Sequence, residues 1–130
     1  MMSNKKIMAI VTNSELGFIN IKDELDEYYK YLECDVIQVL DVKINTKSYT
    51  LILDDEGKLK EHYVNCVFLD KDKNQIDYIA NHLIIQKYDY ARDEAIDLSR
   101  DDIEHLIDWF KNCTKLIDFE NNRLVPTIEL

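Results

Sequence analysis

The segment at residues 49–64 reads YTLILDDEGKLKEHYV, and it decides between a β-rich fold and an acidic metal site. Its first five residues have the length and the apolar, β-branched character of a strand. Asp54, Asp55 and Glu56 follow, directly before Gly57. An aspartate at a turn bonds the nearby backbone, and a glycine supplies the positive φ that closes the turn. A calcium-binding loop needs oxygen ligands at alternating positions over about 12 residues, which this segment lacks. We therefore predict a strand, a turn at residues 54–57 and a return strand at residues 58–64.

Other short segments predict further strands, because each is rich in β-branched or aromatic residues and is bounded by a polar turn. They are residues 5–12, 17–22, 35–44, 65–70 and 76–90, and then a terminal hairpin at residues 115–130 that turns around ENN at 120–122. The sequence thus predicts between five and eight strands.

Two segments have the spacing of an amphipathic helix. The first begins after Asp23, a good N-cap residue, and ends near Glu33. The second, at residues 97–114, begins with Ser99 and Asp102 at the spacing of a capping box. The apolar faces expected for the two helices are Leu25, Tyr28, Tyr29 and Leu32 in the first, and Ile103, Leu106, Ile107 and Phe110 in the second.

These elements predict an α+β fold, mainly antiparallel sheet with two amphipathic helices. We expect a single domain over residues 1–130, because two glycines and one proline leave no room for a flexible linker. The apolar run near the N-terminus is too short for a secretory signal, and no run is long enough to span a bilayer. We therefore expect no membrane association and a cytoplasmic location.

The net charge is −10, from 26 acidic against 16 basic residues. A protein that binds phosphate backbones needs a basic face, so direct binding to DNA or RNA is disfavoured. Two interpretations stay open. The acidic surface either keeps the protein soluble, or it competes for the basic groove of another protein.

The sequence predicts no catalytic residue, no cofactor and no metal. Its three histidines and three cysteines lack the paired spacing of a zinc site. Gly17 and Gly57 stand alone, so a glycine-rich phosphate loop is excluded. The carboxylates fall on turns and helix faces, where solvation is the default, and we therefore expect a protein that is not an enzyme.

Candidate binding residues lie in the acidic segment at residues 89–108 and directly before it. Tyrosine and arginine are favoured anchors of pockets and interfaces, and the acids here either cap the second helix or present a negative face. The candidates for binding a ligand or a partner are Lys87, Tyr88, Tyr90, Arg92, Asp93, Glu94, Asp97 and Asp101.

Several motifs, taken in order, resemble the small proteins catalogued as domain of unknown function 3846, which occur in phages, plasmids and conjugative elements. The matching positions are Asp55, Glu56, Gly57 and Lys58 at the corner, then Asn65, and then Asp77 and Ile79. The resemblance runs from about Asp23 to the C-terminus. Asn81 stands where that family has a glycine, and YLEC at 31–34 replaces a usual glycine pair. The resemblance brings no catalytic residues and implies a mobile genetic element inside a bacterial host.

In that setting we expect a non-enzymatic accessory protein that counters a host defence system by binding. One mechanism is an acidic surface at residues 89–108 that blocks a host effector protein. The other is a sponge for a signalling nucleotide, held by Lys87, Tyr88, Tyr90 and Arg92, which allows a homo-oligomer with pockets between subunits. The alternative is a house-keeping interaction module of the mobile element with no role in defence.

Overall fold

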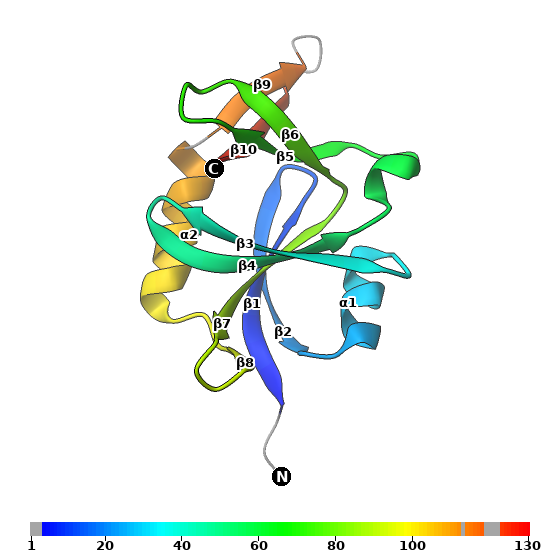
Figure 1. Ribbon diagram of the computed structural model, residues 1–130, viewed down its shortest axis with the longest axis vertical. Helices are drawn as coiled ribbons and strands as arrows, with labels where there is room; N and C mark the ends of the chain where they lie inside the picture. The colour runs from blue at the N-terminus through cyan, green and yellow to red at the C-terminus, as the bar shows by residue number, and fades with distance from the viewer. Residues whose placement is uncertain (1–3, 113, 119–122) are drawn as a thin grey trace.

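Figure 1 shows the computed structural model of the chain, which describes residues 4–112, 114–118 and 123–130. Its elements, in chain order, are β1 (Lys5–Thr12), β2 (Glu15–Lys22), α1 (Leu25–Leu32), β3 (Ile37–Ile44), β4 (Lys47–Asp54), the 3-10 helix η1 (Gly57–Leu59), β5 (Val64–Leu69), β6 (Gln75–Ala80), β7 (Leu83–Asp89), β8 (Glu94–Ile96), α2 (Arg100–Asn112), β9 (Thr114–Asp118) and β10 (Arg123–Glu129).

The described strands form two sheets. The larger has the order β2-β1-β7-β4-β3, with β8 paired to β7, and the smaller has the order β6-β5-β10-β9. Every pairing is antiparallel except β5 with β10, which is parallel. The α+β class and the mainly antiparallel pairing are therefore confirmed. The expected number of strands was too low, because the structure describes ten.

The larger sheet is covered unequally on its two faces, as Figure 1 shows with α2 and α1 on opposite sides. One face packs against α2 and the smaller sheet in a core that contains Leu51, Leu83 and Trp109. The other face packs against α1 through Tyr28 and Leu32. Because α1 has only eight residues, it covers only part of this second face.

The corner at residues 54–57 confirms one prediction and corrects two others. Asp54 Oδ1 accepts the Glu56 N–H at 2.9 Å, as expected of an aspartate at a turn. The predicted return strand is wrong, because η1 follows the turn and the chain then enters the other sheet. Gly57 has no positive φ. Glycine is instead favoured by close packing, since a Cβ here would lie 3.2 Å from the Ala80 carbonyl oxygen.

The predicted single strand at residues 76–90 is wrong. Asn81 adopts φ 63°, and the chain passes there from β6 in the smaller sheet to β7 in the larger one. The Asn81 N–H donates to the Tyr63 carbonyl at 3.0 Å, which fixes the bend. Asparagine enters the left-handed region more readily than most residues, and this explains how an apolar, strand-like segment changes sheets here.

The first helix ends at Glu33 as predicted, but its start differs. Glu24 occupies the N-cap without a side-chain bond, and Asp23 accepts the Tyr28 hydroxyl instead. On the expected apolar face, Tyr28 and Leu32 are buried, whereas Leu25 is 55% exposed.

The second helix begins with the predicted capping box. Asp102 Oδ2 accepts the Ser99 N–H at 3.0 Å, and Ser99 Oγ accepts the Asp102 N–H at 3.1 Å. Most of the predicted apolar stripe faces the core, since Leu106 is buried and Ile103 and Phe110 pack against the core, and the prediction missed the buried Asp102 and Trp109. The terminal hairpin is confirmed by the antiparallel pair β9–β10, and its predicted ENN turn lies outside the described residues.

Candidate functional site

A groove lies on the part of the larger sheet that α1 leaves uncovered. Its volume is about 410 Å³, which is within the range of small-molecule and side-chain pockets. Residues from α1 and the loop before it form one wall, residues from β7 and the β7–β8 connection form the other, and the strands form the floor. The lining residues are Asp23, Leu25, Tyr28, Ile37, Val39, Thr50, Ile52, Gln86, Tyr88, Tyr90 and Asp93.

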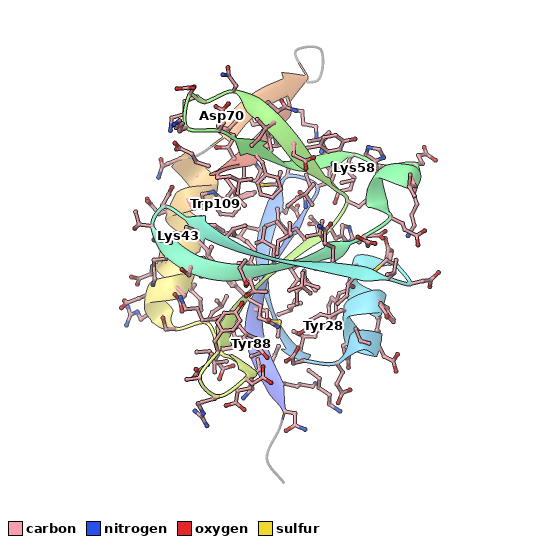
Figure 2. All side chains as sticks on the ribbon, viewed as in Figure 1. Tyr28, Lys43, Lys58, Asp70, Tyr88 and Trp109 are labelled. Atoms are coloured by element: carbon pink, nitrogen blue, oxygen red, sulfur yellow. The ribbon has the colours of Figure 1, made fainter. Side chains whose placement is uncertain are left out.

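Tyr28 forms the helix wall of the groove. Figure 2 shows its side chain on α1, with Tyr88 from β7 across the lower half of the view. The buried Gln86 amide donates to the Tyr28 hydroxyl at 2.7 Å, and that hydroxyl donates to the Asp23 carboxylate. Burial raises the pKa of Tyr28 above its ordinary value, and the bond to Asp23 raises it further. Tyr28 is therefore a fixed donor that holds one carboxylate at the rim.

Tyr88 and Tyr90 form the opposite wall. Their ring centroids lie 4.9 Å apart in an edge-to-face arrangement, a favourable geometry for two aromatic rings. The Tyr88 hydroxyl donates to Asp93 Oδ1 at 2.6 Å, and this bond raises the pKa of Tyr88 to about 12. The Tyr90 hydroxyl donates to Asp41, which also accepts the Thr50 hydroxyl at 2.9 Å.

A second hollow of about 290 Å³ continues the groove along β3 and β4. It shares Thr50, Tyr88 and Tyr90 with the groove and adds Asp41 and Lys43. The groove and this hollow together carry three tyrosine–carboxylate pairs. A carboxylate that accepts one tyrosine hydroxyl keeps further lone pairs for another donor.

The chemistry of the groove favours a cationic group. Aromatic faces attract ammonium and guanidinium ions, and carboxylates at the rim accept their hydrogen bonds. No lysine or arginine is among the residues that line the groove itself. In the groove itself an anionic ligand such as a phosphate would therefore meet negative charge without a cation, and the adjoining hollow adds one lysine, Lys43, to its lining.

The structure brings together three of the eight residues predicted from the sequence, namely Tyr88, Tyr90 and Asp93. Lys87 points to the opposite face of the sheet, where its ammonium donates to the Ser48 carbonyl at 2.9 Å and lies 3.8 Å from Asp102. This alternation follows from the strand geometry, because successive side chains of β7 point to opposite faces.

The other predicted residues lie away from the groove lining. The Arg92 guanidinium lies 3.2 Å from the Glu94 carboxylate, and both side chains are exposed. Asp97 accepts the Ile7 N–H at 2.7 Å and so attaches the segment after β8 to β1. Asp101 is exposed in the first turn of α2.

Sequence reasoning missed the groove residues that come from distant parts of the chain, namely Asp23, Tyr28, Asp41, Thr50 and Gln86. The sequence of β3 does contain one pattern that points toward the groove, because Ile37, Val39 and Asp41 alternate with their neighbours and so share one face of the strand. That pattern marks a half-exposed face, but it does not show that Asp41 meets Tyr90, which is 49 positions away.

Two observations on the described residues concern metal ligands and thiols. These residues contain no group of three or more histidine, cysteine, aspartate or glutamate side chains that would hold a metal ion. Burial raises the pKa of the Cys34 and Cys66 thiols, which disfavours the reactive thiolate. Within the same ranges, no helix has the length and apolar character needed to cross a membrane.

The motif residues Lys58, Asn65 and Asp77 make structural contacts between distant segments. The Lys58 ammonium lies 4.5 Å from the centroid of the Tyr78 ring and pairs with the Asp77 carboxylate, which attaches η1 to β6. The buried Asn65 amide donates to the Val11 carbonyl at 2.8 Å and joins the smaller sheet to β1. These contacts give three of the motif residues a structural role.

A family model, domain of unknown function (DUF3846), matches residues 5–111. The chain therefore belongs to this family, and the resemblance seen in the sequence is confirmed. The match begins earlier than expected, at β1, and ends in α2 before the β9–β10 hairpin. No curated protein and no solved structure matches the chain.

Proposed function

We propose that this member of the DUF3846 family acts by binding and not by catalysis, and that its groove receives a positively charged side chain of a partner protein. The observation that carries the proposal is the set of three tyrosine–carboxylate pairs, Tyr28–Asp23, Tyr88–Asp93 and Tyr90–Asp41. Tyr88 and Tyr90 present aromatic surface beside these carboxylates, and the buried Tyr28 holds Asp23 at the rim. Arginine side chains are common anchors of protein interfaces, and this lining complements them.

The same observation favours a protein partner over a signalling nucleotide. A nucleotide brings phosphates, which arginine and lysine hold best. The two cations considered for that role, Lys87 and Arg92, are engaged with Ser48 and Glu94 outside the groove lining. A sponge would therefore need its cations to leave these contacts.

The partner that the resemblance suggests is a defence protein of the bacterial host. Many such proteins act on nucleic acid through basic grooves, and an acidic chain of net charge −10 complements a basic groove. Occupation of that groove would block the effector. The alternative is a partner encoded by the same mobile element, with no role in defence.

The test is retention of host proteins from a lysate by the immobilised chain and two matched variants. The groove variant, Asp41→Asn with Asp93→Asn, removes two charges but keeps hydrogen-bond acceptors. The control variant, Asp101→Asn with Asp108→Asn, removes two charges from the exposed side of α2. We expect the wild type and the control to retain the same partner, and the groove variant to lose it by about tenfold or more, which corresponds to about 1.4 kcal/mol.

Two results would contradict the proposal. Equal retention by both variants would remove the groove from the function, and loss in the control alone would transfer the role to the acidic side of α2.

A thermal shift of several degrees with a cyclic or linear nucleotide would instead establish the sponge, since a ligand at about 100 times its Kd adds about 2.7 kcal/mol. A phage challenge then separates the partner classes, because only a defence partner makes phage plating depend on the groove.

A further inference from the structure

The strand beside the groove has one unpaired edge. β3 is the end strand of the larger sheet and pairs with β4 along all eight of its residues. No described strand pairs with its other side. An edge strand presents a row of free backbone groups to which another chain can add.

The register shows which residues carry those free groups. The β3–β4 register pairs Ile37 with Asp54, so Val36 stands opposite Asp55 one position further. The Asp55 N–H donates to the Val36 carbonyl at 3.1 Å, which makes these two a hydrogen-bonded pair. Such pairs recur at every second residue of an antiparallel ladder. The N–H and C=O groups of Ile37, Val39 and Asp41 therefore point away from β4.

The same three residues also direct their side chains to the groove face. Ile37 and Val39 line the groove, and Asp41 lines the hollow that continues it. Val39 is 55% exposed in the middle of this edge. The free backbone groups and the groove therefore lie side by side along residues 37–41.

The far end of β3 lies beside β10. A hollow there is lined by Lys43 and Ile44 of β3 together with Thr127 and Glu129 of β10. Figure 2 shows Lys43 at this end, near Trp109 of α2. The part of the edge that borders the groove and its continuation, away from β10, is residues 37–41.

We propose that the partner adds an extended segment to the edge at residues 37–41, with a lysine or arginine beside Asp41 and an apolar side chain beside Val39. This inference rests on the proposed function and gives its binding mode. Added strands gain affinity from main-chain hydrogen bonds and specificity from alternate side chains. Neighbouring side chains on adjacent strands lie about 5 Å apart, so a cation on the added strand reaches the Asp41 carboxylate.

The edge carries little of the usual protection against such pairing. Natural edge strands are guarded by lysines, prolines, bulges or inward charges. Residues 37–41 read IQVLD, without proline, lysine or a recorded register shift. The one charge in this segment is Asp41, which repels an acidic strand and attracts a basic one.

The test uses a synthetic peptide with the palindromic sequence acetyl-Thr-Val-Thr-Arg-Thr-Val-Thr-amide. It presents arginine and valine two positions apart in either strand direction, so the unknown orientation of the partner does not matter. Titration of the ¹⁵N-labelled chain by NMR, up to about 1 mM peptide, should shift the amides of Ile37, Val39 and Asp41. The amides of β2, the opposite edge of the same sheet, should stay in place.

Three comparisons make the result specific. N-methylation of one alternate set of peptide amides should weaken binding by about tenfold or more, and methylation of the other set should not. Replacement of the peptide arginine by glutamate should abolish binding. The Asp41→Lys variant should reverse that preference and bind the glutamate peptide more tightly, which also shows that the variant is folded.

The outcomes separate this inference from the proposed function. If both methylated peptides bind like the parent, cation binding stands and strand addition is wrong. If the peptide fails while host partners still depend on Asp41 and Asp93, strand addition is again wrong and the proposed function stands. Concentration-dependent shifts of the same three amides without peptide would identify a second copy of the chain as the occupant and overturn the proposal.

Discussion

Asp102 is a buried carboxylate whose charge is held by three neighbouring residues, Ser99, Lys47 and Tyr49. It is 3% exposed and caps α2 through Ser99. The Lys47 ammonium from the β3–β4 hairpin lies 2.8 Å from it, and the Tyr49 hydroxyl of β4 lies 3.3 Å away. Burial alone raises the pKa of this carboxyl, but the bonds from Lys47 and Ser99 outweigh burial and lower the pKa to about 2.

This lowered pKa predicts an acid-sensitive contribution to stability. A folded-state pKa of about 2 against an ordinary value of 3.8 contributes about 2 kcal/mol above pH 4, and this is lost as the pH falls toward 2. The Asp102→Asn variant should therefore unfold at a lower urea concentration at pH 7, and its stability should fall less than that of the wild type between pH 4 and 2.

The neighbouring Asp101 provides the control for this measurement. It is exposed, so Asp101→Asn should change the free energy of unfolding by less than about 0.5 kcal/mol at pH 7. Equal losses in the two variants would show that the contacts of Asp102 do not stabilise the fold.

Local chemistry of this kind is what the sequence predicts well. The Ser99–Asp102 cap depends on residues three positions apart, and Tyr88, Tyr90 and Asp93 come to one wall because one short connection holds them. Asp23 and Asp41 reach the same groove from other elements. Their positions depend on tertiary packing, which no local pattern specifies.

At the scale of elements, the bend at Asn81 separates two strands that the sequence presents as one. Residues 76–90 are strongly apolar on both sides of the bend, so periodicity gives no reason to divide them. The division appears only where Asn81 turns left-handed and bonds Tyr63.

We predict that Asn81 is replaceable by glycine but not by valine. Glycine adopts a φ of 63° without steric cost, whereas a β-branched side chain is strained there. The Asn81→Val variant should lose about 1–3 kcal/mol of stability in urea unfolding, and Asn81→Gly should lose less than about 1 kcal/mol. A valine variant as stable as the glycine variant would mean that this backbone conformation is not what holds the bend.

At the scale of the molecule, the parallel pairing of β10 with β5 completes the smaller sheet. Short connections favour antiparallel neighbours, and this expectation covers the hairpin pairs β1–β2, β3–β4 and β5–β6. It fails for β5 and β10, because Val67 pairs with Thr127 across about 60 positions of sequence. The division into two sheets follows from this long-range pair and from Asn81, and neither leaves a clear pattern in the sequence.

The segment beyond the family match should be essential for stability. Ile128 of β10 is 1% exposed in the main core, whereas Leu124 of the same strand is 49% exposed. The Ile128→Ala variant should therefore lose about 2–4 kcal/mol of stability, and Leu124→Ala less than about 1 kcal/mol, in urea unfolding. Similar losses at both positions would contradict the burial of β10 in this core.

The single tryptophan of the chain lies where α2 contacts β10. Trp109 of α2 is fully buried, and its indole N–H donates to the Thr127 carbonyl of β10 at 2.7 Å. On the ribosome, β5 and β6 emerge long before β10 and must wait as a two-stranded hairpin, which is marginal alone. The pairing of β5 with β10 joins residues about 60 positions apart, and contacts that distant in sequence form slowly. The fluorescence of Trp109 therefore reports the last closure of the fold, and a newly made chain exposes an unfinished sheet until that signal changes.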